Sequence, residues 1–420
     1  MNNATTSTAV VIGGGIIGAC CAYALLDRGF AVTLIEKDAP GRAASFGNSG
    51  SIGLASVPPL GMPGMLKDTP RMLLDPHHPL VVRWSHLPTA LPWLLKFARN
   101  LSPARVAAIS RGRAALLAQA GTAYDVLLAQ IGRPELLHGG GLVFAYESEA
   151  GLRGDRAGIE LRRRHGIEVR EMTGAELREL EPAISERAVC GTYFPIVRTA
   201  LDPLDVTEAI VGAFIARGGR LLHEEVRAFE MGAGGVEQVA TNVARHPAGL
   251  VVLAAGAWSR ALAEMLGERF PLIAERGYHI MIADPPFAPA IPVVSGEWHV
   301  NMTTMTTGLR LSTMAEFAAI DAAPNHARVL KVCEGAARLI RGLELKVASR
   351  WVGSRPSTPD SLPVIGRSTR QRNVIHAFGH GHLGLTFGPI TGAIVAALAR
   401  DEAPPLDIAP YRPDRSFVAP

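Results

Sequence analysis

The chain has 420 residues, of which 48% are hydrophobic and 19% are charged, a balance typical of a globular protein with two domains. Its 42 lysines and arginines against 38 aspartates and glutamates give a formal net charge of +4. No dense basic block is interleaved with aromatic residues, so the sequence gives no support for nucleic-acid binding. The four cysteines show neither zinc spacing nor a disulfide framework, so we expect no metal site and a reducing, cytoplasmic location.

The sequence predicts neither a signal peptide nor a membrane-spanning segment. The first eight residues are polar and lack a charged segment, so no signal peptide is predicted. We find no uninterrupted apolar run long enough to span a bilayer, and any membrane attachment would be peripheral.

Residues 9–36 predict a βαβ unit. The run 9–12 is apolar and β-branched, as in a buried strand, and residues 16–28 carry the apolar face of a helix. Residues 30–35 form a second apolar strand that ends at Glu36. Three glycines in the spacing G-x-G-x-x-G follow the first strand. This order of strand, glycines, helix and strand predicts a dinucleotide site. The alternative is a βαβ unit that binds nothing.

The three glycines, Gly13, Gly15 and Gly18, have separate roles in such a site. The first permits a tight turn, the second lets the backbone approach a pyrophosphate, and the third lets helix and strand pack closely. The helix N-terminus attracts the phosphate charge. Glu36 stands where a ribose hydroxyl needs an acceptor, which favours FAD or NAD over NADP.

The stretch 37–64 is too rich in Gly, Ser and Pro to form a regular element, and it leaves the ribose end of the site. Loops of this kind bring backbone N–H groups close to a ligand. We therefore expect cofactor contacts from Arg42, Ser45, Asn48 and Gly50. A solvent-exposed loop is the alternative.

Residues 58–103 alternate prolines with apolar and aromatic groups. Basic and aromatic side chains stand close together there: Arg83, Trp84, Trp93, Lys96, Phe97 and Arg99. This mixture could rest on a membrane interface or cover the cofactor. An irregular excursion packed on the domain is the alternative. Residues 104–131 then predict a long helix.

Two blocks of strands without a second glycine fingerprint predict an antiparallel sheet in a separate substrate domain. In the first block, residues 139–196, the strands are separated by a helix over 150–165 and by a short helix capped at Thr173. The second block, residues 270–316, precedes a helix at 325–341.

Further elements complete the expected cofactor domain. Residues 203–217 predict an amphipathic helix, and residues 220–231 predict one strand that passes through Val226. Residues 249–260 predict a strand that runs into small residues, where the backbone can approach the ligand again. The C-terminal segment predicts a strand, a glycine-rich turn and a helix from about Thr386, whose N-terminus would stabilise the anionic ring of a reduced flavin.

Specific marks of a known family lie along almost the whole chain. They are VVIGGGIIG with Glu36, ASFGNSG at 44–50, the Pro/Trp-rich excursion at 58–100, RGYHIMI at 276–282, RLSTMAEF at 310–317, SRPSTPDSLPVIGR at 354–367 and GHGHLGLT at 379–386. In these motifs the chain resembles the superfamily of FAD-dependent D-amino-acid oxidases and glycine oxidases. It looks most like the bacterial D-amino-acid dehydrogenase branch.

The resemblance implies an α/β fold in which a Rossmann-like FAD-binding domain is interleaved with an antiparallel-sheet α+β substrate domain. The flavin ring would lie between the two. The FAD-binding domain would comprise residues 1–57, 198–262 and 345–420. The substrate-binding domain would comprise residues 58–197 and 263–344.

The resemblance also assigns site residues. Arg355 falls on the arginine that pairs with the substrate carboxylate in related oxidases, Tyr278 on a tyrosine that orients the same group, and His380 on the GHG turn. A planar two-pronged donor suits a carboxylate. A surface ion pair with Asp360 is the alternative for Arg355, and a core tyrosine the alternative for Tyr278. The expected FAD contacts are Gly13, Gly15, Ile16, Ile17, Gly18, Glu36, Lys37, Arg42, Ser45, Asn48, Gly50, Val226, Ala255, Gly256, Gly379, Gly381, His382, Leu383, Gly384 and Thr386.

The sequence departs from the family pattern in three places. Gly47-Asn48-Ser49-Gly50 replaces ANAG, His382 replaces a threonine, and Ser312-Thr313 replaces two glycines. These changes lie near the flavin or substrate pocket, which leaves open a substrate other than an alanine-like one. The closing GHG segment contains no cysteine, so we expect FAD to be bound non-covalently.

The activity implied by the resemblance is oxidative deamination of a D-amino acid to a 2-oxo acid and ammonia. Hydride would pass from Cα to flavin N5 without a side-chain base. The electrons would leave to a quinone or another carrier, with a peripheral contact to the inner face of the membrane left open. The alternatives are oxidation of glycine, sarcosine, D-proline or hydroxy-D-proline, a non-catalytic FAD-binding subunit and, as a poorer fit, an NAD-dependent dehydrogenase.

Overall fold

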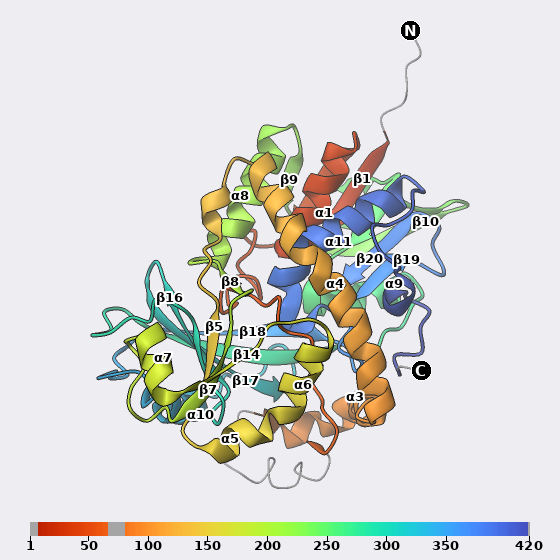
Figure 1. The fold of residues 1–420 in the computed structure, drawn as a ribbon. Helices are drawn as coiled ribbons and strands as arrows, with labels where there is room; N and C mark the ends of the chain where they lie inside the picture. Colours follow the sequence, from red (N-terminus) through yellow and green to blue (C-terminus); the bar gives the residue numbers. More distant parts are fainter. Residues whose placement is uncertain (1–6, 66–79, 419–420) are drawn as a thin grey trace.

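A six-stranded sheet carries the glycine motif in the computed structural model, which describes residues 7–65 and 80–418 (Figure 1). All neighbouring strands are parallel except the edge strand β19, which is antiparallel to β20. The sheet has the order β19–β20–β13–β1–β2–β9, with bounds β1 Thr8–Ile12, β2 Ala31–Glu36, β9 Arg220–His223, β13 Leu250–Leu253, β19 Val364–Arg367 and β20 Val374–Phe378.

The predicted βαβ unit forms as expected at the amino terminus. Helix α1 (Ile16–Asp27) starts directly after the turn, in which Gly13 has a φ of +105°. A Cβ added to Gly18 would lie 1.7 Å from the carbonyl oxygen of Gly13, so only glycine allows this close approach of helix and turn. Gly29 ends the helix and donates its N–H to the carbonyl of Leu26.

Helices cover one face of the six-stranded sheet (Figure 1). They are α1, α4 (Pro103–Gln130), α8 (Pro203–Ala216) and α11 (Gly384–Ala399). Helix α11 packs against both α1 and α4, and its apolar side chains are almost all buried. The predicted helices over 16–28, 104–131 and 203–217 are thus confirmed.

The segment Gly381–Ala399 is long and apolar enough to cross a membrane, which the sequence analysis did not predict. In the structure, however, 72% of this window is buried. Because it packs inside the helical layer against α1 and α4, we describe it as a core helix.

A small antiparallel sheet and one helix cover the other face. They are β10 (Val226–Gly232), β11 (Gly235–Thr241), β12 (Arg245–Pro247) and α9 (Ser259–Met265). The prediction of one strand over 220–231 was wrong: β9 ends at His223 in the large sheet and β10 starts at Val226 in the small one. Short segments complete this part of the chain: β3 Ser51–Ile52, β8 Arg198–Thr199, η3 Gly256–Trp258, η4 Gly381–Leu383 and η5 Ala409–Tyr411.

The second large sheet has nine strands and is mostly antiparallel. Eight of them run in the order β18–β14–β17–β16–β15–β5–β7–β6, and β4 pairs with β17. The bounds are β4 Leu80–Val82, β5 Leu142–Tyr146, β6 Arg170–Thr173, β7 Cys190–Phe194, β14 Ile273–Ile282, β15 Val293–Ser295, β16 Val300–Met305, β17 Gly308–Phe317 and β18 Val347–Ser357. The β15–β5 and β17–β4 pairs are parallel.

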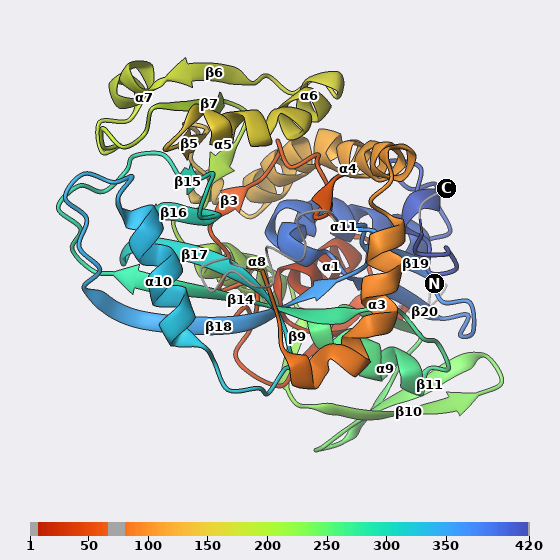
Figure 2. The same ribbon diagram turned by 90° about the horizontal axis from the view of Figure 1, so that it is seen from below.

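Four helices accompany this sheet. They are α5 (Glu149–Gly154), α6 (Arg156–Arg164), α7 (Gly174–Leu180) and α10 (His326–Ala337), which lies across the sheet in Figure 2. The single helix predicted over 150–165 was wrong, because α5 and α6 meet at Asp155. The predicted cap at Thr173 is confirmed: its hydroxyl accepts from the N–H of Glu176, whose carboxylate accepts from the N–H of Thr173.

The structure confirms the predicted combination of a Rossmann-like sheet with a second, largely antiparallel sheet. The expected domain borders stay a prediction. Two elements pack against the part of the fold on the other side of these borders. Strand β18, beyond the border at residue 345, pairs with β14 of the nine-stranded sheet. Helix α4, within the range 58–197, packs on α11 of the Rossmann-like layer.

The described part of the excursion after residue 58 packs against the nine-stranded sheet. Residues 66–79 are outside the described part. Beyond them, β4 leads into η1 (Trp84–His86) and α3 (Leu87–Arg99), a helix that contains Pro92. Trp93 donates its indole N–H to the carbonyl of Ser357 at 3.0 Å. Arg83 lies 2.7 Å from the buried carboxylate of Glu316 on β17.

The contact between α1 and α11 gives a test of the helical layer. A Cβ at Gly392 would lie 2.6 Å from the backbone oxygen of Cys20, whereas a Cβ at Gly212 on α8 would meet nothing within 4 Å. We expect Gly392→Ala to separate the helices and destabilise the protein by about 1–3 kcal/mol. Gly212→Ala should stabilise it by up to about 1 kcal/mol. Denaturant unfolding of both variants is the measurement, and equal effects of the same sign would contradict this packing.

Candidate active site

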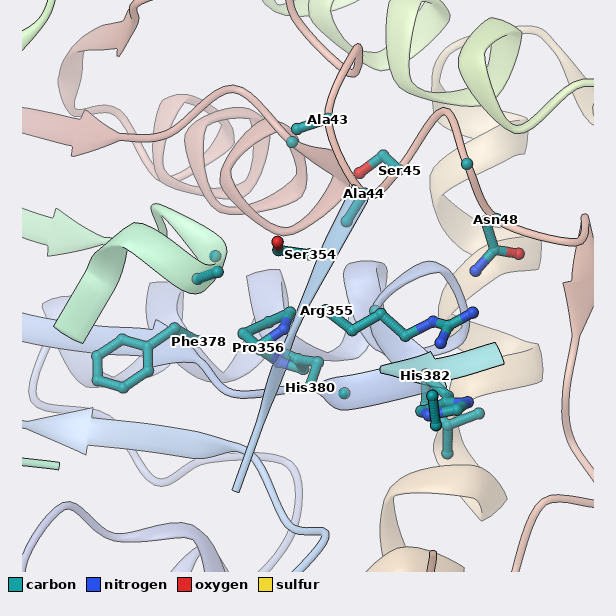
Figure 3. A pocket seen from close by; sticks show the side chains of 18 of the residues that line it. Ala43, Ala44, Ser45, Asn48, Ser354, Arg355, Pro356, Phe378, His380 and His382 are labelled. Carbon is teal, nitrogen blue, oxygen red and sulfur yellow. The ribbon is translucent and has the colours of Figure 1, made fainter. Parts of the chain in front are cut away.

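A cavity of about 1580 Å³ extends from the glycine motif to the nine-stranded sheet. Its wall comes from the β1–α1 turn, the loop 37–56, η3, β18 and the turn before α11 (Figure 3). The excursion contributes β4, η1 and α3 to the same wall. Segments far apart in the sequence therefore enclose one space, as expected for a long cofactor with a substrate beside it.

The nucleotide end of this cavity is organised around Glu36 and Ser45. One carboxylate oxygen of Glu36 accepts the N–H of Gly14 at 2.6 Å, and the other accepts the N–H of Asp38 at 3.1 Å. The Ser45 hydroxyl accepts the N–H of Ile16 at 2.9 Å and so caps α1. Both side chains are thus held at the N-terminus of α1, where a nucleotide phosphate and ribose fit.

Most of the predicted cofactor contacts line the cavity. They are Gly13, Gly15, Ile16, Ile17, Glu36, Lys37, Arg42, Ser45, Asn48, Val226, Ala255, Gly256, Gly381, His382, Leu383 and Gly384. Gly18, Gly50, Gly379 and Thr386 are not among the lining residues. Gly18 acts in helix packing, as described above, and the Thr386 hydroxyl accepts the N–H of Gly53 at 2.9 Å.

Two large side chains, those of Arg310 and Trp351, fix the position of the loop around Gly47. Arg310 on β17 is buried and donates from one guanidinium nitrogen to the carbonyls of Phe46 and Asn48 at 2.8 and 2.7 Å. The Trp351 ring lies where a Cβ of Gly47 would be, with the nearest ring atom 1.8 Å from that position. These contacts fix the position of the loop in the cavity wall.

Burial strongly lowers the pKa of two side chains next to this loop, His279 and Arg310. Burial, and then the charge of Arg310, lowers the pKa of His279 to about 3, so the imidazole that stacks on Trp351 is neutral. Burial lowers the pKa of Arg310 to about 10, so its guanidinium remains charged at neutral pH.

Arg355 faces the cavity from β18 and is paired with a buried glutamate. Its Nη1 atom lies 3.1 Å from Oε1 of Glu275, the residue directly opposite it on β14. The same Nη1 donates to the carbonyl of Met314 at 2.8 Å. The surface ion pair with Asp360, considered from the sequence, does not form, because Asp360 pairs with Arg415 at 2.7 Å.

The carbonyl of Met314 reaches Arg355 through an irregularity in β17. The pairing of β14 with β17 shifts register between Arg276 and Tyr278, and Met314 has a φ of +73°. This left-handed conformation is rare for a residue other than glycine and is found at functional sites. A bulge in the strand therefore turns one carbonyl toward the guanidinium.

Glu275 has three partners although its side chain is fully buried. Its Oε1 accepts from Arg355 and lies 2.5 Å from Nε2 of His382, and its Oε2 accepts from the hydroxyl of Ser357 at 2.8 Å. Burial alone would raise the pKa of Glu275, but the charges of His382 and Arg355 and the hydrogen bonds lower it to about 2. The carboxylate is therefore ionised at neutral pH.

The two other predicted catalytic residues are hydrogen-bonded to protein side chains, and their catalytic roles stay a prediction. Tyr278 is not among the residues that line the cavity, and its hydroxyl donates to the buried carboxylate of Glu316, as in the alternative of a core tyrosine. His380 lines the cavity, but its Nε2 lies 3.0 Å from the hydroxyl of Thr391. Burial lowers the pKa of His380 to about 3.

Glu275, Trp351 and Arg310 are not among the site residues predicted from the sequence. One signal for Glu275 was present: an acidic residue stands between the apolar run PLIA and an arginine. Such a residue in a buried strand requires a partner. The β14–β18 register identifies this partner as Arg355, and that register could not be predicted from the sequence.

The two hydrogen bonds from Arg310 to the loop give a second prediction. We expect Arg310→Met to keep the length of the side chain but lose two hydrogen bonds from a charged donor, each contributing roughly 1.5–3 kcal/mol. FAD should then dissociate at least about tenfold more readily, as followed by the fluorescence of released flavin. Arg153→Met, at an exposed helix position, is the control. An unchanged FAD affinity in a folded Arg310→Met protein would contradict this role.

The curated relatives with similar sequences match over nearly their whole length. D-amino-acid oxidase from Bradyrhizobium diazoefficiens is 34% identical over 412 residues, which cover 96% of this chain and 98% of the relative. D-amino acid dehydrogenase from Helicobacter pylori is 28% identical over 401 residues, which cover 94% and 95%.

A solved structure with the same fold is that of glycine oxidase from Geobacillus kaustophilus. It has a TM-score of 0.74 and 23% identity, and the match covers 98% of this chain and 99% of that one. The family described as FAD dependent oxidoreductase (DAO) matches residues 8–398. With a cavity built for a dinucleotide and a matching sequence over nearly its full length, the chain belongs to the DAO family of FAD-dependent oxidoreductases.

Proposed function

We propose that this protein oxidises the Cα–N bond of a D-amino acid, and that the resulting imino acid hydrolyses to a 2-oxo acid and ammonia. The coarser statement, an FAD-dependent amino-acid oxidase or dehydrogenase, follows from the family and its named relatives. The D configuration is supported by the names of the two relatives with 34% and 28% identity.

The observation that carries the proposal is the position of Arg355. The contacts of its guanidinium with Glu275 and Met314 both use Nη1, and Arg355 lines the cavity. The planar fork can therefore offer its other nitrogens to a substrate carboxylate. Holding the carboxylate there fixes the Cα of an amino acid in the same cavity as the cofactor.

FAD, when bound, supplies the hydride acceptor for this reaction. The chain supplies the cradle for its phosphates at the start of α1 and the acceptor Glu36 for its ribose. The Rossmann-like layer and the nine-stranded sheet enclose the site from two sides, which keeps much of the solvent away from the reacting atoms.

The test is an anaerobic bleaching screen of the FAD-loaded protein over D- and L-amino acids, glycine, sarcosine and prolines. D-amino acids should bleach the flavin absorbance. Bleaching by L-amino acids alone would overturn the D configuration. Bleaching by glycine, sarcosine or a proline alone would assign the protein to the alternative substrates, and bleaching by none would indicate a non-catalytic FAD-binding subunit.

Arg355 can be tested by its effect on substrate binding. We expect Arg355→Met to raise KM at least about 100-fold, because the carboxylate loses a bidentate charged partner. Arg350→Met, at an exposed position of the same strand, is the matched control. An unchanged KM in a folded Arg355→Met protein would remove Arg355 from the substrate site.

For the electron acceptor we propose a quinone reached at the membrane surface. The support is the excursion, which lines the cavity and carries exposed apolar side chains next to basic ones: Trp84, Leu91 and Leu95 beside Lys96 and Arg99. Trp84 is 76% exposed. An amphipathic segment of this kind suits a peripheral contact with an anionic bilayer. The proposed location is the cytoplasmic face of the membrane.

This proposal predicts two behaviours. The bleached protein should be reoxidised faster by a soluble quinone than by oxygen, and it should sediment with anionic vesicles. Leu91→Asp should weaken vesicle binding by about tenfold or more. Val126→Asp, at an exposed apolar position on α4, should not. Rapid peroxide release without quinone reduction would indicate an oxidase instead.

A further inference from the structure

A histidine–glutamate pair lies at the substrate end of the cavity and is not used by the proposed reaction. Nε2 of His382, in the turn before α11, lies 2.5 Å from Oε1 of Glu275. Glu275 is fully buried, whereas the His382 side chain is 45% exposed and lines the cavity. Figure 3 shows the side chains of His382 and Arg355 close to one another on the cavity wall.

The pair fixes which imidazole nitrogen carries hydrogen. A carboxylate ionised at neutral pH can only accept a hydrogen bond, so Nε2 of His382 must be the donor. The second nitrogen, Nδ1, is then the atom that can take up a proton. A buried carboxylate behind a histidine orients the ring in this way in enzymes that use histidine as a base.

The position of His382 relative to Arg355 brings a substrate amine within reach. Both residues contact the same oxygen atom of Glu275, at 2.5 and 3.1 Å. In an α-amino acid, the nitrogen is attached to the carbon that bears the carboxylate. When Arg355 holds the carboxylate, the ammonium group on that carbon can therefore lie beside the imidazole.

We propose that His382 is a catalytic residue whose Nδ1 accepts the proton of the substrate ammonium, and that Glu275 is its positioning residue. An N–H bond of the ammonium breaks, an Nδ1–H bond forms, and the electron pair stays on the substrate nitrogen. The neutral amine then has the lone pair that assists departure of hydride from Cα. The inference rests on the proposed amino-acid substrate and differs from the sequence-based expectation that no side-chain base is needed.

The charges around His382 favour this role. Glu275 faces it from β14 and Arg355 from β18, and these two charges cancel. Helix α11, which follows the turn, carries no titratable side chain. His380 in the same turn is buried against Thr391 and stays neutral.

The first test follows flavin bleaching by a D-amino acid under anaerobic conditions as a function of pH. We expect His382→Asn to slow the reduction roughly 100- to 10,000-fold at neutral pH. The rate should recover as the pH rises above the pKa of the substrate ammonium, because solvent then supplies the neutral amine. Glu275→Gln should also slow the reduction at neutral pH, because the imidazole loses the acceptor that fixes its orientation, and this loss should likewise recover above the pKa of the substrate ammonium.

The matched control is His246→Gln. His246 also pairs with a glutamate, Glu224, at 2.6 Å, but it lies on β12 and does not line the cavity. Its pH profile should be that of the wild type. A His382→Asn protein with an unchanged profile would overturn the inference.

The second test measures binding without turnover. The probes are isobutyrate and 2-aminoisobutyrate, which differ only in the amine; the latter has no hydrogen on Cα and cannot give up hydride. In calorimetric titrations of the FAD-loaded protein, His382→Asn should weaken 2-aminoisobutyrate by about tenfold or more and leave isobutyrate unchanged. Equal weakening of both probes would show that His382 binds the carboxylate, and would overturn its assignment as a base.

These outcomes separate this inference from the proposed function. If no amino acid bleaches the wild-type flavin, the proposed function fails. If the wild type is bleached and His382→Asn behaves in the same way, only the role of His382 fails.

Discussion

The ionised carboxylate of Glu275 has no exposed surface, and it can remain charged there only because three neighbours surround it. They come from β18 and from the turn before α11, so one buried charge joins the nine-stranded sheet to the Rossmann-like layer. Removing one partner of a buried ion pair costs about 3–5 kcal/mol. The position of Arg355 at the cavity depends on this contact.

The two layers have different tasks in this arrangement. The start of α1, with Glu36 and Ser45, is a rigid backbone cradle whose shape is set by glycines. The nine-stranded sheet instead presents side chains, held by cross-strand pairing and by the bulge at Met314. Family membership accounts for the first task, whereas the chemistry of the substrate depends on the second.

The parts of the fold set by local physics could be predicted from the sequence. The glycine spacing, the capping box at Thr173 and the end of α1 at Gly29 each depend on neighbouring residues. The break between β9 and β10 could not be predicted, because residues 220–231 remain extended on both sides of it and only the choice of partner strand changes. The break at Asp155 is a single irregular residue in a helical pattern.

The same distinction holds for the site. Cofactor contacts follow a contiguous motif, and most of the predicted ones line the cavity. The partner of Arg355 lies 80 residues away and is decided by strand register. Tyr278 and its neighbour His279 point to opposite faces of β14, and a motif alone does not tell which face meets the substrate.

The most direct measurement is a crystal structure of the FAD-loaded protein with bound 2-aminoisobutyrate. Its carboxylate should lie within hydrogen-bond distance of Arg355, its nitrogen should face Nδ1 of His382, and the Glu275 contacts should be preserved. A probe bound elsewhere in the cavity, with Arg355 still directed only at Glu275 and Met314, would show that Arg355 does not hold the substrate carboxylate.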